Sequence, residues 1–164
     1  MVEENNIWTE DEDTQRDKYM TFTACGENYG ISISCVNEIV GLSKIAEVPE
    51  TASYVRGLIN LRGKIIPVID VRMRFGKEPL EYNDRTCVIV ITVNKTVVGL
   101  IVDKIAEVCT VEQDQIVPPP TVVNNSGQTR FIYGIVRSED EVTMLIDPAR
   151  LISDEDQEAL RNLA

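Results

Sequence analysis

The densest structural signal in the chain is Gly57-Leu58-Ile59-Asn60-Leu61-Arg62-Gly63-Lys64-Ile65-Ile66-Pro67-Val68-Ile69-Asp70. Two apolar runs flank the charged tip, and Gly63 can take the positive φ that a tight turn requires. The second run is apolar on both faces, which predicts a strand buried on both sides. Pro67 cannot donate a ladder hydrogen bond, so we expect this strand to lie at an edge or to contain a bulge.

The same plan recurs later in the chain. Residues Gly134 to Asp147 again run glycine, strand, charged tip, strand ending Ile-Asp, and then a predicted helical turn. The two tips differ in charge, since the first carries Arg62 and Lys64 and the second Glu139 to Glu141. Two similar units predict two small β-barrels of similar plan. Chance recurrence of a generic hairpin is the alternative.

The segments around this stretch have mostly strand periodicity. The predicted strands are residues 19–23, 29–33, 86–93, 96–102 and 103–111, with the last hairpin at 131–136 and 142–146. Val36, Ile39 and Val40 share one face at helical spacing, which predicts a short helix or helical turn over 34–40. Ser153 begins a predicted C-terminal helix, with Asp156 placed as in a capping box.

Length and composition indicate a globular protein. A chain of 164 residues with 43% hydrophobic residues can form one ordinary domain or two small ones. Its N-terminus is acidic and lacks the basic and apolar regions of a secretory signal, so we expect a cytoplasmic protein. The net charge of −11 comes mainly from residues 1–17 and 153–164. Nucleic acid is therefore not an expected partner, and 1–17 is predicted to be an acidic flexible tail.

The chain has no histidine and four cysteines without CxxC spacing. We therefore expect no metal site and no cofactor, and the usual histidine-dependent nucleophiles are excluded. A small enzyme is the rival interpretation, with Asp70, Asp103 and Asp147 plus a cysteine as its candidate groups. Each aspartate follows a predicted strand, which favours a capping or turn role over a catalytic one.

Several segments resemble the CheW family of bacterial chemotaxis coupling proteins. In the family's usual order, they are Tyr29-Gly30-Ile31, Val36-Asn37-Glu38-Ile39, Gly57 to Gly63, Ile66 to Asp70, Arg72, Phe75, Gly76 and Val97 to Asp103. The resemblance extends from about Tyr19 to Leu151, and the Asn60-to-Gly63 segment is its most specific part. The acidic head lies outside the pattern, and residues 137–141 depart from it.

The resemblance implies a mainly β fold of two SH3-like five-stranded β-barrels, joined at a hydrophobic interface, with short helices and a C-terminal helix. The expected divisions are a tail at 1–17, a first barrel at 18–82, a second barrel at 83–152 and a helix at 153–164, with strands free to cross between the barrels. It also implies a non-catalytic adaptor that couples the cytoplasmic tips of chemoreceptors to the regulatory domain of the histidine kinase CheA. Such an adaptor is cytoplasmic and is recruited to membrane receptor arrays.

The resemblance places receptor contacts in a groove between the barrels. The expected contact residues are Val36, Glu38, Ile39, Gly57, Asn60, Arg62 and Val108. Arg62 is the expected polar anchor, because a guanidinium offers five donors. Without the resemblance, Arg62 and Glu38 would be ordinary surface charges. Gly57 and Asn60 can instead serve the turn, and Val108 favours core packing over contact.

For the kinase-binding face, the candidates are Tyr29, Ile31 and Ile33, whose alternative role is interior packing. The functional alternative that remains within signalling is a coupling scaffold for a CheA-like kinase in a non-chemotactic pathway.

Overall fold

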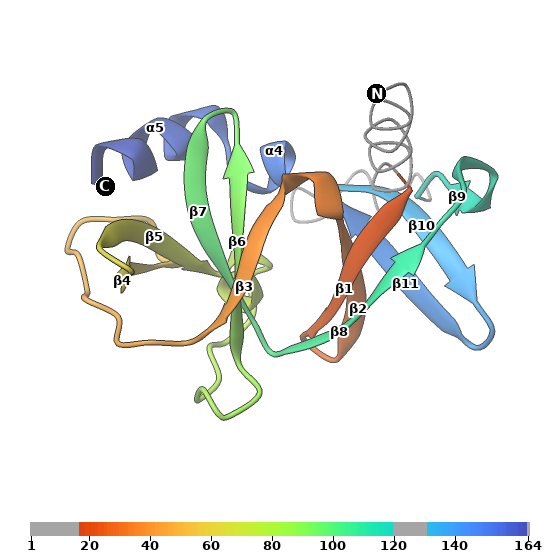
Figure 1. The fold of residues 1–164 in the computed structure, drawn as a ribbon, viewed down its shortest axis with the longest axis horizontal. Coiled ribbons are helices and arrows are strands. Elements are labelled where there is room, and N and C mark those ends of the chain that lie inside the picture. Colours follow the sequence, from red (N-terminus) through yellow and green to blue (C-terminus); the bar gives the residue numbers. More distant parts are fainter. Residues whose placement is uncertain (1–16, 120–130, 164) are drawn as a thin grey trace, which may run out of the picture.

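The computed structural model describes residues 17–119 and 131–163, whose strands form two sheets (Figure 1). The five-stranded sheet has the order β3-β6-β7-β5-β4. Its strands are β3 (Val36–Gly41), β4 (Val55–Leu61), β5 (Lys64–Asp70), β6 (Cys87–Val93) and β7 (Thr96–Val102). The acidic segment predicted as a flexible tail lies outside the described residues except for Asp17.

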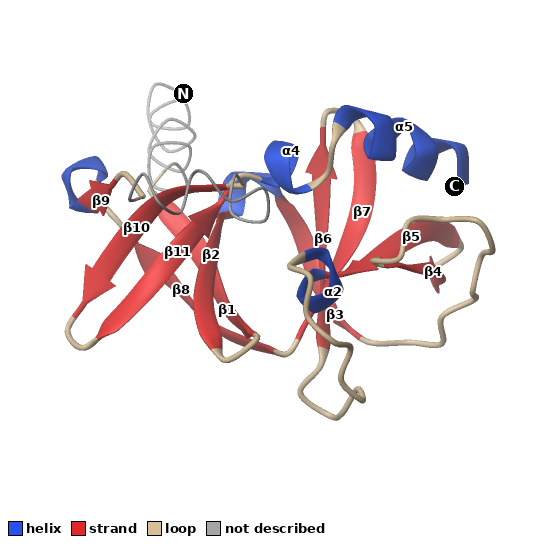
Figure 2. Ribbon diagram, turned by 180° about the vertical axis from the view of Figure 1, so that it is seen from behind, coloured by secondary structure: helices blue, strands red, loops and turns tan. Residues whose placement is uncertain are grey.

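The six-stranded sheet has the order β8-β1-β2-β11-β10-β9. Its strands are β1 (Lys18–Ala24), β2 (Glu27–Ser32), β8 (Lys104–Thr110), β9 (Ile116–Val117), β10 (Ile132–Ser138) and β11 (Glu141–Ile146). Short helices connect the strands: η1 (Ile33–Cys35), α2 (Val71–Arg74), η2 (Gln113–Gln115) and α4 (Pro148–Leu151). The chain closes with α5 (Asp154–Leu163), which lies across one end of β6 and β7 in Figure 2. The predicted mainly β fold of two SH3-like units with a C-terminal helix is confirmed.

The boundary expected at residue 82 does not coincide with a boundary between the sheets. Strands β6 and β7 complete the sheet that begins with β3, whereas β8 to β11 return to β1 and β2. The five-stranded sheet is therefore continuous in sequence from 36 to 102. The six-stranded sheet is assembled from the two ends of the chain, and strands cross between the subdomains.

The two similar sequence units occupy equivalent places in the two sheets. In each unit the second strand pairs in parallel with a strand of another hairpin, β5 with β7 and β11 with β2. In each unit an aspartate caps a one-turn helix: Asp70 is the last residue of β5, and Asp147 directly follows β11. The Oδ1 atom of Asp70 accepts a hydrogen bond from the Arg72 N–H at 2.9 Å, and that of Asp147 from the Ala149 N–H at 3.0 Å. The expected capping role of these two aspartates is confirmed.

A single apolar cluster joins the two sheets. Phe22 of the six-stranded sheet and Leu100 of the five-stranded sheet are both fully buried in it. Aromatic rings continue the contact, because the Phe75 ring centroid lies 4.8 Å from those of both Tyr29 and Phe131. Burial of apolar surface on this scale stabilises the arrangement of the sheets as well as each sheet.

The prediction of a helix over 34–40 is wrong for most of these residues. Only Ile33–Cys35 is helical, and Val36–Gly41 forms strand β3. The burial of β3 alternates residue by residue, as in a strand with one covered face. Its antiparallel pairing with β6 explains the difference, since this ladder outweighs a helical spacing of three apolar residues.

Two expectations for the 64–70 strand also need correction. β5 lies inside its sheet, between β7 and β4, and not at an edge. Pro67 is tolerated because the parallel pairing with β7 begins one residue later, at Val68. The strand is buried on both faces only from Ile66 onward, since the Ile65 side chain is 46% exposed.

Candidate binding groove

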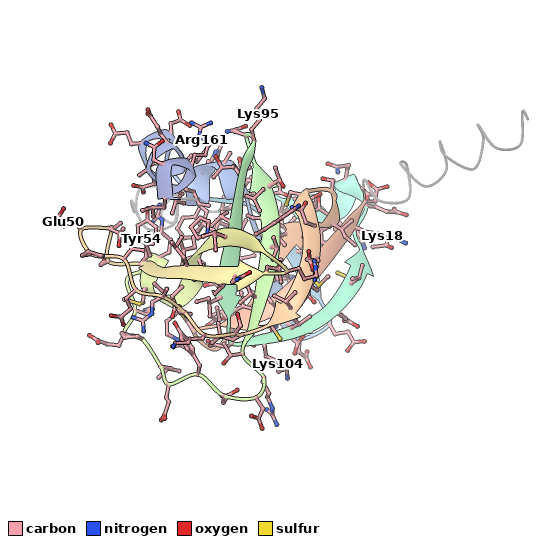
Figure 3. All side chains as sticks on the ribbon, turned by 60° about the vertical axis from the view of Figure 1, so that its left-hand side comes forward. Lys18, Glu50, Tyr54, Lys95, Lys104 and Arg161 are labelled. Carbon is pink, nitrogen blue, oxygen red and sulfur yellow. The ribbon has the colours of Figure 1, made fainter. Side chains whose placement is uncertain are left out.

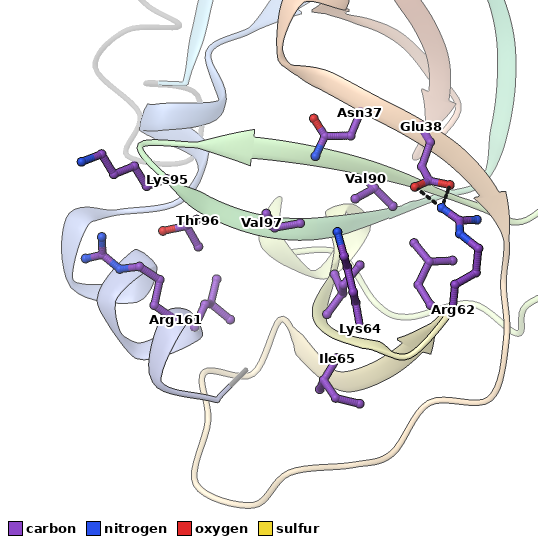
Figure 4. A pocket seen from close by; sticks show the side chains of 13 residues that line it. Asn37, Glu38, Arg62, Lys64, Ile65, Val90, Lys95, Thr96, Val97 and Arg161 are labelled. Carbon is purple, nitrogen blue, oxygen red and sulfur yellow. Dashed lines mark hydrogen bonds and ion pairs between the residues drawn. The ribbon is translucent and has the colours of Figure 1, made fainter.

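A groove of about 590 Å³ opens on the five-stranded sheet (Figure 4). Side chains of β3, the β4–β5 hairpin, the β6–β7 turn and α5 line it. Glu38 and Arg62 lie at one end, and Lys95 and Arg161 lie at the other. We call this surface the β5 groove.

The β4–β5 turn presents Arg62 at the rim of the groove. Arg62 and Gly63 have φ values of 52° and 88°, both in the left-handed region that a two-residue hairpin turn requires. The Asn60 side chain stabilises the turn, because its Oδ1 atom accepts a hydrogen bond from the Gly63 N–H at 2.9 Å. The Arg62 side chain is consequently held outward and is 69% exposed.

Arg62 forms an ion pair with Glu38 across the rim. Its Nη2 atom lies 2.7 Å from Oε1 and 2.5 Å from Oε2 of Glu38. The hydrogen bond from Arg62 lowers the pKa of the Glu38 carboxyl, so the pair is charged at neutral pH. The structure thus joins two predicted contact residues that are 24 positions apart in sequence.

The floor and far end of the β5 groove combine apolar surface with positive charge. Ile65 and Val97 are 46% and 39% exposed. Lys64, Lys95 and Arg161 line the same surface and form no ion pair within residues 17–119 and 131–163. An apolar floor with cationic edges suits a segment that carries both apolar and acidic side chains.

Three other predicted contact residues lie near the Glu38–Arg62 pair in sequence but differ in role. Ile39 points away from the covered face of β3 and is 37% exposed. Val36 packs against the main core cluster. Gly57 is buried with a φ of 144°, and a Cβ there would lie 2.1 Å from the Ala46 carbonyl oxygen. Gly57 therefore lets the β3–β4 connection pack against β4.

Val108 lies on the other sheet, on β8, and its side chain is 45% exposed. The preference for core packing at Val108 is therefore wrong.

Tyr29 and Ile31, two of the three expected kinase-contacting residues, are buried in the core cluster that joins the sheets. A contact through these two side chains is also wrong, and interior packing is their role. Ile33 is half-buried in η1.

The far half of the β5 groove was not predicted from sequence. Lys95 comes from the β6–β7 turn and Arg161 from α5, so neither is near the recognised segment in the chain. The opposite charges of the two repeated tips were the available signal. The basic first tip indicates that Lys64 belongs to a positively charged surface, but it does not indicate that Lys95 and Arg161 lie on the same surface.

The groups considered for an enzyme have structural partners. Asp70 and Asp147 cap helices, and Asp103 forms an ion pair with Arg72 and accepts a hydrogen bond from the Cys25 N–H. Burial raises the pKa of three thiols, that of Cys35 to about 11 and those of Cys25 and Cys109 in the same direction, so these thiols are protonated at neutral pH. Within the described residues, no three His, Cys, Asp or Glu side chains are grouped as a metal site requires.

The fold defines a class of proteins built from two SH3-like units, and in this chain one unit has an open groove with charged edges. The family described as CheW-like domain matches residues 18–156. The chain belongs to this family. The chemotaxis protein CheW of Klebsiella aerogenes is 32% identical over 152 residues, which cover 93% of this chain and 91% of the relative.

Other relatives have similar coverage. The chemotaxis protein CheW of Bacillus subtilis is 33% identical over 87% of this chain and 91% of its own length. The crystal structure of the scaffolding protein TtCheW from Thermoanaerobacter tengcongensis superposes with a TM-score of 0.77 and 34% identity, covering 86% of this chain and 95% of that one. Among the helices at residues 17–119 and 131–163, none has the length and apolar character needed to cross a bilayer.

Proposed function

We propose that the protein is a non-catalytic chemotaxis scaffold that couples chemoreceptors to the histidine kinase CheA. The observation that carries the proposal is the Glu38–Arg62 pair at the mouth of the β5 groove. It combines a fixed polar anchor with adjacent exposed apolar surface, which is what a helical receptor tip needs from its partner. The names of the relatives, which are chemotaxis and scaffolding proteins, support the same role.

The receptor contact extends from the ion pair along β3. Ile39 supplies exposed apolar surface beside Glu38, and Val108 supplies more on β8. Both β3 and β8 stand at the end of their sheets in the described strand order. A receptor hairpin laid against these strands contacts side chains of both sheets, and the kinase regulatory domain binds to surface elsewhere. The scaffold acts in the cytoplasm at the receptor arrays and uses no cofactor.

The test is a reconstitution of receptor control over CheA autophosphorylation with the purified protein. The full chain restores control, and Arg62→Ala weakens receptor association roughly tenfold, as expected for loss of a charge-assisted hydrogen bond. Arg85→Ala is the matched control, because Arg85 is exposed in the loop before β6 and does not line the β5 groove.

Unchanged receptor affinity of Arg62→Ala would remove the ion pair from the receptor site. The unmodified chain could also fail to restore control and bind instead to a CheA-like kinase from another pathway. That result would favour the non-chemotactic coupling scaffold over the chemotaxis scaffold.

A further inference from the structure

The β5 groove has a charge opposite to that of the chain as a whole. Its lining includes four cations, Arg62, Lys64, Lys95 and Arg161, and one carboxylate, Glu38. The 164-residue sequence has a net charge of −11. Only Arg62 of these cations is paired with a carboxylate within the described part of the chain. The cationic lining favours acidic chain segments, and Lys95 and Arg161 extend from the same end of the molecule (Figure 3).

The N-terminal segment of the same chain has the complementary chemistry. Residues 1–16 contain six acids and one base, and between the acids lie the apolar neighbours Ile7 and Trp8. Acids at Glu3 and Glu4 precede this apolar pair, and residues 10–13 are all acidic. Apolar side chains flanked by carboxylates match a floor of Ile65 and Val97 flanked by amines and a guanidinium.

The place where the segment joins the described structure and its extended length set how far it can reach. It joins the described structure at Asp17, just before β1, and Figure 1 shows β1 beginning on the same edge of the molecule as the β6–β7 turn and α5. The chain from Asp17 back to Trp8 spans up to about 30 Å when extended. That exceeds the length of a seven-residue strand, about 23 Å, such as β1 or β7.

We infer that the acidic N-terminal segment, residues 1–16, binds in the β5 groove of its own chain, with Ile7 and Trp8 on Ile65 and Val97 and its carboxylates near Lys64, Lys95 and Arg161. The covalent link makes the binding intramolecular, so weak contacts suffice at any protein concentration. A partner that uses the Glu38–Arg62 end of the groove must then compete with the segment. The inference does not depend on the proposed function, because it concerns the protein without partners.

Trp8 is the single tryptophan of the chain and reports its own environment. In the unmodified protein, its fluorescence emission is expected at the shorter wavelengths of a partly buried indole, and raised ionic strength shifts it toward those of exposed tryptophan. The triple variant Lys64→Glu/Lys95→Glu/Arg161→Glu gives the exposed emission at low salt. The control Lys44→Glu/Lys77→Glu/Arg85→Glu has the same change in charge at exposed positions outside the groove and retains the buried emission.

Three results would overturn the inference: exposed emission in the unmodified protein, an equal shift in both triple variants, or emission that depends on protein concentration. The last would assign the groove to the segment of a second copy. A second measurement is independent of whether the triple variants fold. In Trp8→Ala, the amide resonances of Ile65 and Val97 are expected to shift relative to the parent, and unchanged resonances count against the inference.

Discussion

Gly57 shows how a residue in a recognised motif can be required for the fold alone. Its φ of 144° and its approach to the Ala46 carbonyl oxygen leave no space for a side chain. Gly63 in the same hairpin has a φ of 88° but no heavy atom within 4 Å of an added Cβ. A side chain at Gly63 would cause backbone strain alone, whereas a side chain at Gly57 would cause both backbone strain and steric overlap. Comparing the two positions therefore distinguishes the two causes of destabilisation.

Gly57→Ala is expected to lower the free energy of unfolding by about 3 kcal/mol or more, because it adds overlap with Ala46 to the strain of positive φ. Gly63→Ala is the matched control, with an expected loss of about 1–2 kcal/mol from backbone strain alone. Urea denaturation measures both. Equal losses for the two variants would show that the β3–β4 connection moves away without resistance.

Cys35 predicts a pH dependence of stability. Its thiol donates a hydrogen bond to the Ser32 carbonyl at 3.0 Å, and burial raises its pKa to about 11. The folded protein therefore keeps a proton that the unfolded chain loses near pH 9. Stability from this group is present below pH 9 and is lost as the pH rises toward 11, by up to about 2 kcal/mol.

Denaturation curves between pH 8 and pH 11 measure the loss, and Cys35→Ala is expected to have a flatter dependence over this range. Tyr29 and Tyr82, whose pKa values burial raises to about 12, contribute in the same direction above pH 10 in both proteins. An identical pH dependence in the variant would exclude Cys35 as a contributor.

At the scale of elements, the repeated hairpin–helix unit is used twice with different burial. Asp70 is 3% exposed, and its second oxygen accepts a hydrogen bond from the Tyr82 hydroxyl at 2.8 Å. Asp147 caps α4 in the same way, but its side chain is 36% exposed and faces Arg150. The two aspartates cap their helices with the same local geometry. They differ in their other partners, because Asp70 also accepts the hydrogen bond from the Tyr82 hydroxyl.

Asp147→Ala is therefore expected to cost about 1 kcal/mol, the usual value of a helix cap. Asp70→Ala is expected to cost about 2–3 kcal/mol, because it also leaves the Tyr82 hydroxyl without its acceptor. Thermal denaturation compares them, and Asp70→Asn, which keeps a capping oxygen, should recover part of the loss. A larger cost for Asp147→Ala than for Asp70→Ala would contradict this account.

The elements also show how far the sequence alone could go. The hairpins were predictable because each has alternating apolar residues and a turn with a glycine or adjacent polar residues. Strand β3 was not, because Val36, Ile39 and Val40 fit a helical face and only pairing with β6 selects the strand. The buried roles of Tyr29 and Ile31 depend on a second sheet packing against them, which no local pattern encodes.

Only one end of the β5 groove could be predicted from the sequence. Glu38 and Arg62 lie in segments with family resemblance, so both were candidates before their ion pair was known. Lys95 and Arg161 are 66 residues apart, and only the packing of α5 near the β6–β7 turn brings them to one surface. Surfaces assembled from distant elements need the tertiary structure to be found.

At the scale of the whole molecule, a polar contact supplements the apolar core between the sheets. Arg72 follows β5 of the five-stranded sheet and forms an ion pair with Asp103, which lies where the chain passes from β7 to β8. Asp103 also accepts a hydrogen bond from the N–H of Cys25, in the β1–β2 turn of the six-stranded sheet. One carboxylate thus contacts both sheets.

Asp103→Ala is expected to lower the free energy of unfolding by about 2 kcal/mol, because Arg72, only 14% exposed, loses its charged partner. Faster hydrogen exchange in the β1–β2 turn should accompany the loss. Arg150→Ala removes the exposed Arg150–Asp147 pair and serves as the control, with an expected cost below about 1 kcal/mol. Similar effects of the two variants would assign Asp103 no special role between the sheets.

The division of the six-stranded sheet between the two ends of the chain has a consequence during synthesis. Strands β1 and β2 leave the ribosome before β3 to β7, whereas β8, a partner of β1, and β11, the parallel partner of β2, follow those five strands. Strands β3 to β7 are consecutive and can associate in the meantime. The β1–β2 hairpin thus lacks these neighbours while five other strands are made, and its unpaired edges have to be kept out of aggregates during that time.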